Sequence, residues 1–126
     1  GKSHASATRA YDLLTHQPVK GSKKMGGIRF GEMERDCMIS HGSARFLKER
    51  LFDVSDCYRV HVCQKCGLFC EANLGESKNH CKLCDSSDKI CHVRIPYASK
   101  LLLQELMAMQ IKPRLHTTML RNSNER

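Results

Sequence analysis

Hydrophobic and polar residues recur with a helical period in the first half of the chain. Across residues 32–41, Met33 and Cys37 lie one turn apart on an apolar face, and acidic residues occupy the first turn, where a helix carries partial positive charge. Gly42 can adopt the left-handed conformation that ends a helix. Residues 44–52 carry a second apolar stripe. The pattern predicts two helices joined at a glycine, as in a helix-turn-helix, although any tight helix pair shares this pattern.

The second half of the chain predicts two strands and a further helix. Residues 58–62 and 89–95 alternate between apolar and polar positions and contain β-formers, which is typical of strands. From Pro96 to about residue 110, apolar side chains would lie on nearly every face of a helix. The chain has only 27 Leu, Ile, Val and Phe residues, too few to cover such a helix. We therefore expect a partner surface there.

The start of the chain lacks regular periodicity. Residues 1–27 have no dependable period, and residues 20–27 form a glycine-rich, cationic loop. The chain begins Gly1-Lys2 rather than with Met, which predicts a processed chain or a piece of a longer protein. No apolar run approaches the ~18 residues of a membrane span, and no secretory signal is evident, so we expect no membrane partner.

The net charge of +8 is unevenly distributed. Residues 1–30 contain six basic residues and one acidic residue, residues 31–99 contain ten of each, and residues 100–126 contain five basic and two acidic residues. A basic end suits a polyanion such as nucleic acid, because Lys and Arg displace condensed counterions from phosphates. A solvated basic tail would have the same composition. Charge alone therefore leaves nucleic-acid binding open.

Four of the eight cysteines form two Cys-x-x-Cys pairs, Cys63–Cys66 and Cys81–Cys84, with 14 residues between them. Two residues between thiols let a tight knuckle direct both sulfurs at one ion about 2.3 Å away, which is the pattern of a four-thiolate zinc ribbon. Gly67 permits a left-handed turn after the first pair, and the polar stretch 71–80 suits a flexible connection. One structural zinc ion would contribute roughly 10–16 kcal/mol of apparent folding energy and offset the small core.

Other roles for the cysteines fit less well. Disulfides suit a secreted chain, and a redox Cys-x-x-Cys needs a single pair in a βαβ unit, which does not precede Cys63. A catalytic zinc needs an open position, which four thiolates close. Cys70 and His80 are the candidates for substitute ligands. The cysteines outside the two pairs are expected to be small buried hydrophobes or partly exposed thiols: Cys37, Cys57, Cys70 and Cys91.

The string Gly26-Gly27-Ile28-Arg29-Phe30-Gly31-Glu32-Met33-Glu34 resembles the C-terminal part of the second-largest subunit of multisubunit RNA polymerases, including the bacterial β subunit. The ribbon and the strings at 95–98 (Ile-Pro-Tyr-Ala) and 103–109 (Leu-Gln-Glu-Leu-Met-Ala-Met) are most similar to the eukaryotic polymerase II version. The resemblance runs from about Lys2 to Leu115. It implies a nuclear, DNA-directed RNA polymerase, a nucleotidyltransferase.

The expected fold class is α+β, with an irregular basic loop, a helix-turn-helix-like anchor, a four-cysteine zinc ribbon with short antiparallel strands, and a C-terminal helix. The resemblance implies a switch segment beside the DNA–RNA hybrid (residues 1–31), a helical anchor against the largest subunit (32–56), the zinc ribbon of the clamp (57–95), and a final helix with a basic tail (96–126). It implies the largest and other polymerase subunits, the DNA template and the hybrid as partners.

The resemblance also implies functional residues in the switch segment. The cations Lys20, Lys23, Lys24 and Arg29 lie on a glycine loop and can contact a nucleic-acid backbone without reading bases. Two-metal nucleotidyl transfer, with Mg²⁺ ions, would come from the largest subunit. We therefore expect the whole polymerase to need Mg²⁺ and this chain to contain no complete catalytic site.

The start of the chain departs from the family pattern. In the family, Lys-x-His-Ala-Arg followed by Gly-Pro lies near the active centre. Here Lys2 and His4 match, but Ser6 replaces the Arg and Arg9-Ala10 replaces Gly-Pro. His4 is therefore either a neighbour of the initiating nucleotide or RNA end, or a solvated side chain.

Two alternative functions follow from the same residues. A stand-alone zinc-ribbon regulator that binds nucleic acid or protein predicts a monomer whose C-terminal helix packs on its own core. A polymerase module instead leaves residues 101–109 exposed for a partner. A thiol oxidoreductase would use one Cys-x-x-Cys pair without zinc.

Overall fold

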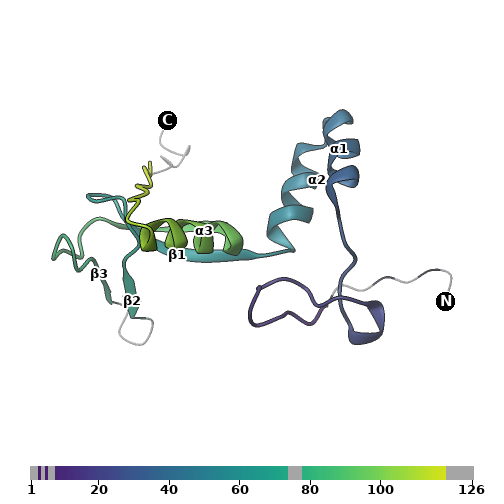
Figure 1. Cartoon of the computed structure of the whole chain (residues 1–126), viewed down its shortest axis with the longest axis horizontal. Coiled ribbons are helices and arrows are strands. Elements are labelled where there is room, and N and C mark those ends of the chain that lie inside the picture. Colours follow the sequence, from purple (N-terminus) through teal and green to yellow (C-terminus); the bar gives the residue numbers. More distant parts are fainter. Residues whose placement is uncertain (1–2, 4, 6–7, 74–77, 119–126) are drawn as a thin grey trace, which may run out of the picture. The chain divides into compact units, whose positions relative to one another are not determined.

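The computed structural model describes residues 3, 5, 8–73 and 78–118 of the chain (Figure 1). The chain forms two compact units. The first consists of Gly1–Tyr58 with Ile95–Leu101, and the second of Arg59–Arg94 with Leu102–Arg126. The architecture mixes helices with short strand pairs around a cysteine cluster, which confirms the expected α+β class.

The predicted helix pair is present in the first unit. Helix α1 (Glu32–Ser40) and helix α2 (Ala44–Lys48) lie side by side (Figure 1). The Glu34 carboxylate accepts a hydrogen bond from the Gly31 N–H at 2.9 Å and caps α1. Gly42 has φ +71° and turns the chain between the helices, as predicted. The second helix differs from the prediction beyond Lys48, where it widens into a π-helical segment η2 (Glu49–Asp53).

The N-terminal segment forms a hairpin followed by a closed loop, although its sequence shows no period. Tyr11 pairs with Pro18 in antiparallel fashion, and Lys20 pairs with Gly27 around the 3₁₀ turn η1 (Ser22–Lys24). A Cβ atom on Gly26 would overlap the carbonyl oxygen of Val19. Only glycine fits at this position, so the loop is a tightly closed structure.

Aromatic contacts join the hairpin to the other segments of the first unit. The His16 ring centroid lies 4.0 Å from that of Tyr97, and the Tyr97 centroid lies 5.1 Å from that of Tyr58. Lys100 Nζ lies 5.1 Å from each tyrosine ring centroid. Cation–π and ring contacts therefore replace a conventional apolar core here.

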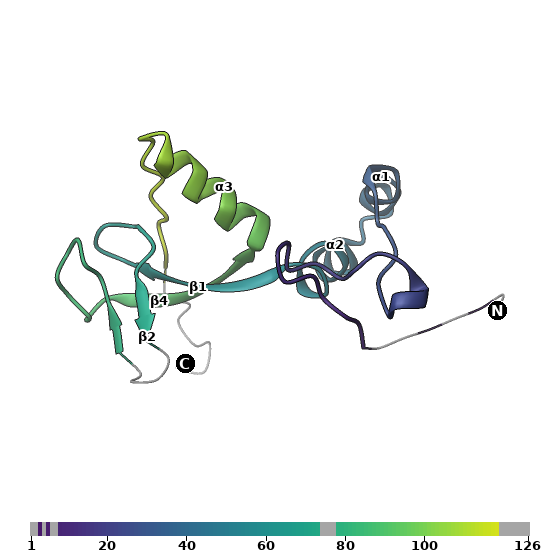
Figure 2. The same ribbon diagram turned by 60° about the horizontal axis from the view of Figure 1, so that its bottom comes forward.

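The two predicted strands of the ribbon form a sheet. They are β1 (Cys57–Cys63) and β4 (Ile90–Pro96), which lie alongside each other (Figure 2). Gln64 N–H donates to Lys89 O at 2.8 Å, and Tyr97 N–H donates to Asp56 O at 2.9 Å. From the first of these hydrogen bonds to the second, the position flanking β1 falls from 64 to 56 while the partner position rises from 89 to 97. The two strands are therefore antiparallel. Val62 on β1 is fully buried and belongs to the small core, which consists of Val60, Val62, Cys63, Leu68 and Cys81.

The connection between the cysteine pairs differs from the expectation. The sequence predicts a flexible polar connection over residues 71–80, but β2 (Glu71–Asn73) and β3 (Lys78–His80) pair as antiparallel strands. Polar side chains do not prevent this pairing, because the backbone supplies the hydrogen bonds. An ion pair between Lys82 Nζ and Glu71 Oε1 at 2.6 Å also links the start of β2 to the segment that follows β3.

The predicted C-terminal helix is α3 (Tyr97–Ala108), which begins after Pro96 rather than at it. None of its residues is buried, and the Leu102 side chain is 56% exposed. The chain therefore covers this apolar helix only in part, as the shortage of core residues predicts: Leu103 and Leu106 are half-buried, whereas Leu102 is exposed. Among the described residues, no helix has both the length and the apolar character needed to span a bilayer.

Candidate metal centre and basic groove

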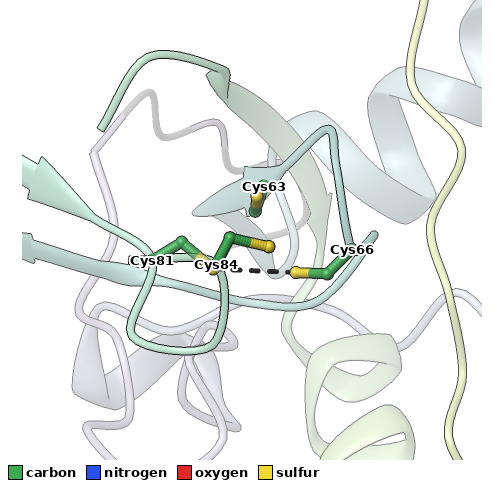
Figure 3. Close-up of side chains that lie close together, drawn as sticks. All are labelled: Cys63, Cys66, Cys81 and Cys84. Atoms are coloured by element: carbon green, nitrogen blue, oxygen red, sulfur yellow. Dashed lines mark hydrogen bonds between the residues drawn. The ribbon is translucent and has the colours of Figure 1, made fainter. Parts of the chain in front are cut away.

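Four thiols from the two Cys-x-x-Cys pairs converge in the second unit (Figure 3). The sulfurs of Cys63, Cys66, Cys81 and Cys84 all lie within 4.8 Å of one another, and the Sγ atoms of Cys66 and Cys81 are 3.6 Å apart. A tetrahedral ion with metal–sulfur bonds of about 2.3 Å places its sulfurs about 3.8 Å apart. The four cysteines can therefore hold one metal ion of this size.

The first knuckle follows β1 directly. Gly67 has φ +72°, and its N–H donates to the carbonyl oxygen of Cys63 at 2.8 Å. Cys63 N–H in turn donates to Leu68 O at 3.0 Å. The turn folds the chain back so that Cys63 and Cys66 face the same point, as the sequence predicts.

The second knuckle uses a different residue for the same turn. Asp85 follows Cys84 and has φ +48°, a conformation that Asp tolerates better than most residues. Cys81 N–H donates to Ser86 O at 3.0 Å. The Asp85 carboxylate contacts His80 Nε2 at 3.3 Å. Asp85 is not predicted from the sequence, although its place directly after the second cysteine of its pair matches that of Gly67.

The four thiols differ in acidity. Backbone N–H donation by Cys66 lowers the pKa of Cys63 to about 7. Desolvation raises the pKa of Cys66 and raises that of Cys84 to about 12. Ionising one thiol makes it harder to ionise its neighbours, whereas a dication would stabilise all four as thiolates. Metal binding at this site therefore releases protons.

The remaining cysteines lie outside the cluster. Among the described residues, the four cysteines are the only group of three or more Cys, His, Asp or Glu whose ligand atoms gather closely enough for one ion. Neither Cys70 nor His80 joins them, so the structure does not support them as substitute ligands. Burial raises the pKa of Cys70 to about 11, and Cys37 is exposed on α1. Cys70 is half-buried, which fits the expected character, whereas Cys37 is more exposed than expected.

A basic groove of about 650 Å³ lies in the first unit, between the closed loop and η2. Within the part of the chain that the structure describes, no acidic side chain lines this groove. Two of the predicted nucleic-acid contacts, Lys20 and Arg29, line it. Lys23 and Lys24 lie on η1, are exposed and do not line it.

Two arginines outside the predicted set also line the groove. They are Arg9, from the N-terminal segment, and Arg50, from η2. Arg50 Nε is buried and has no hydrogen-bond partner among the described residues, whereas Arg50 Nη2 pairs with Glu49 Oε1 at 2.8 Å. The groove therefore combines four cations with one unsatisfied donor. The remaining predicted residue, His4, lies outside the described residues.

Comparisons with known proteins point to one family. The family model described as RNA polymerase Rpb2, domain 7, matches residues 26–118. DNA-directed RNA polymerase II subunit 2 of Arabidopsis thaliana is 54% identical over 125 residues, which cover 99% of this chain and 10% of that protein. The corresponding RPB2 subunit of Meyerozyma guilliermondii is 56% identical over 117 residues, which cover 92% of this chain and 10% of that protein.

A polymerase III relative is somewhat more distant. The subunit RPC2 of Saccharomyces cerevisiae is 48% identical over 114 residues, which cover 90% of this chain and 9% of that protein. The chain thus spans about a tenth of the length of the curated relatives that it matches.

Proposed function

Because this chain belongs to the RNA polymerase Rpb2 domain 7 family, we propose that it forms the C-terminal module of the second-largest subunit of a DNA-directed RNA polymerase. The higher identity to polymerase II subunits, 54% and 56% against 48% for a polymerase III subunit, supports the polymerase II class. In this proposal the module works in the nucleus, within a nucleotidyltransferase whose Mg²⁺ ions and catalytic residues belong to the rest of the enzyme.

The metal that the four cysteines hold is zinc. Four thiolates in a tetrahedral arrangement suit Zn²⁺ or an iron–sulfur cluster, and a single ion fits sulfurs as close as 3.6 Å. Four protein ligands close the coordination sphere, so the zinc is structural. Its role is to hold β1, the two knuckles and the β2–β3 hairpin together, in a unit whose apolar core is very small.

The basic groove contacts the DNA–RNA hybrid through the phosphate backbone. The observation that carries this role is the set of four cations along one groove, beside a loop whose backbone is fixed by Gly26. Long cationic side chains around a rigid loop can contact phosphate oxygens. Such contacts are independent of base sequence, unlike contacts to base edges. Lys23 and Lys24, exposed on the neighbouring turn, extend the positive surface.

The exposed apolar helix α3 docks on other polymerase subunits, the largest subunit first among them. Leu101 and Leu102 are 39% and 56% exposed, and Met109 beyond the helix end is 63% exposed. A stand-alone regulator predicts the opposite, a helix packed on its own core. The partly uncovered helix therefore favours the polymerase module over that alternative.

Association with the polymerase tests the proposal most directly. We expect the tagged chain, expressed in cells, to localise to the nucleus and to co-purify with the largest polymerase subunit. A Leu102→Lys variant tests whether α3 makes the contact. It changes an exposed side chain of this helix and should abolish the association. A stable, monodisperse free chain that binds no polymerase subunit would instead support the stand-alone regulator.

A further inference from the structure

The segment after α3 returns to the zinc ribbon instead of leaving as a solvated tail. Gln110 has φ +63°, and Ile111 N–H donates to Leu106 O at 3.0 Å, so the chain reverses at the end of the helix. The yellow segment that follows α3 then runs back to the β1–β4 pair (Figure 2). From Pro113 to Thr117, alternate residues are half-buried and the residues between them are exposed. This alternation is typical of an extended segment with one face packed on the protein.

Two hydrogen bonds attach this segment to the ribbon. Leu115 N–H donates to the carbonyl oxygen of Gly67 at 2.8 Å. The Cys91 thiol, on β4, donates to Thr117 Oγ1 at 3.3 Å. Gly67 also contributes to the first knuckle through its N–H, which donates to Cys63 O. One residue, Gly67, therefore connects the returning segment to the turn that positions Cys63 and Cys66.

Two features favour glycine at position 67: its backbone conformation and the close approach of the returning segment. Its φ of +72° favours glycine, and a Cβ atom there would lie 3.1 Å from Arg114 Cβ and from the backbone N and O of Leu115. Gly42 provides a comparison within the same chain. It has nearly the same φ, +71°, but no atom lies within 4 Å of the place where its Cβ would be.

We propose that residues 113–117 act as a strap that closes the first knuckle and slows loss of the bound metal. Cys66 and Cys84 are half-buried, whereas Cys63 is 1% exposed and Cys81 is 2% exposed, so a chelator can displace the last two sulfurs only after part of the ribbon opens. With the strap in place, the two peptide groups that flank Gly67 are both held, one through its N–H by Cys63 O and the other through its C=O by Leu115 N–H. Lifting the strap removes the second hydrogen bond and lets the first pair of thiols separate from the ion. The inference rests on the proposed zinc site.

Zinc-release kinetics test the strap in the full chain. The zinc content of the unaltered protein is measured first, and a chromophoric chelator then reports the release rate. Thr117→Val is nearly isosteric and removes the strap's acceptor for Cys91, whose thiol also lies 3.5 Å from Val62 O. We expect this variant to retain one zinc per chain and to release it about twofold to fivefold faster, because a thiol is a weak hydrogen-bond donor. Thr118→Val, at an exposed neighbouring position, should release zinc at the original rate.

A second pair of variants tests the contact at the knuckle. Asn tolerates positive φ, so Gly67→Asn and Gly42→Asn carry a similar backbone cost, but only the first places a Cβ against the strap. We expect Gly67→Asn to release zinc faster and to lose the hydrogen-exchange protection of the Leu115 amide, while Gly42→Asn does neither. If Gly67→Asn does not fold, Thr117→Val still decides the question.

The outcomes separate the two levels of the proposal. An unaltered chain that contains no zinc overturns the metal assignment, and the strap with it. A chain that binds one zinc, and whose Leu115 amide loses protection in a variant with no change in release rate, overturns the strap alone. Faster release at unchanged zinc content, confined to Thr117→Val and Gly67→Asn, supports it.

Discussion

The Sγ atoms of Cys66 and Cys81 lie 3.6 Å apart, although 14 residues separate the two cysteines in the chain. Two like dipolar thiols gain little from such proximity, and two thiolates would repel each other. A shared cation removes this conflict, because it attracts both sulfurs at a distance that fits tetrahedral coordination. The positions of the sulfurs therefore suit a ribbon that binds one metal ion.

Removing one thiol should release the metal and unfold the ribbon. We expect Cys63→Ser to lose zinc, because the site would have three thiolates, and to lose ordered structure. The apparent zinc contribution of roughly 10–16 kcal/mol is comparable to or larger than the whole stability of a typical domain. Metal analysis and circular dichroism measure both effects. Cys37→Ser, at an exposed cysteine outside the cluster, is the control and should keep one zinc. Retention of one zinc by Cys63→Ser would contradict the assignment.

Zinc affinity should fall as the pH falls. Above pH 7, Cys63 without metal is mostly a thiolate, whereas Cys66 and Cys84 remain protonated and must each release a proton on binding. Below pH 7, Cys63 must release its proton as well. The slope of log zinc affinity against pH equals the number of protons released on binding. We therefore expect the affinity to rise with pH, with a slope that is greater by about one below pH 7 than above it. Competition titrations with a chelator of known protonation would measure the slope. A slope of zero would exclude thiolate ligands.

Cations of the groove should control nucleic-acid binding through phosphates. Lys20→Gln combined with Arg29→Gln removes two of the four groove cations. We expect weaker binding to every sequence alike. On duplex DNA, the salt slope should fall by ~0.9 for each phosphate that the variant no longer neutralises. Filter binding or fluorescence anisotropy at several salt concentrations measures the slope.

Two further charge changes make the groove experiment specific. Lys89→Gln, at an exposed lysine of the second unit, should change binding little. Lys23→Ala with Lys24→Ala removes cations outside the groove and should have a smaller effect than the groove pair. Equal effects of all three changes would indicate a diffuse charge effect and would argue against the groove.

Nucleic-acid affinity should depend on the backbone shape of the closed loop as well as on its charge. Gly26→Ala adds a single methyl group that overlaps the Val19 carbonyl oxygen, so the loop must open. We expect nucleic-acid affinity to fall although no charge changes. Gly42→Ala is the control, because its Cβ meets nothing within 4 Å, its φ of +71° carries a cost of about 1–3 kcal/mol, and it does not line the groove. If both variants bind equally well, the loop geometry does not matter.

Helix α3 should contribute to assembly rather than to the stability of the chain. Leu102→Lys places a charge on a side chain that is already 56% exposed, so we expect the free energy of unfolding to change by less than about 0.5 kcal/mol. Association with polymerase subunits should nevertheless disappear. Val62→Lys is the opposite case, since this residue is fully buried and a charge there should unfold the ribbon. Thermal unfolding and co-purification measure the two effects separately; a marked loss of stability in Leu102→Lys would show that α3 packs on this chain.

Local patterns in the sequence predict much of the fold. The helix α1, the turn at Gly42 and the individual strands β1 and β4 are recognisable, because each depends on a pattern of residues that are close together in the sequence. The β2–β3 pairing is not recognisable, because its short strands carry polar side chains and gain their stability from backbone hydrogen bonds. The hairpin at Tyr11 and Pro18 escapes prediction for the same reason.

The spacing of the cysteines is enough to identify the candidate metal site, whereas the surroundings of that site depend on long-range folding. A Cys-x-x-Cys pair builds a knuckle from four consecutive residues, so the ligands can be read from the sequence alone. Arg9 and Arg50 in the groove, and Leu115 on Gly67, come together from positions 41 and 48 residues apart. Such contacts depend on how the chain reverses at Gln110 and in the closed loop, and no local period encodes those reversals.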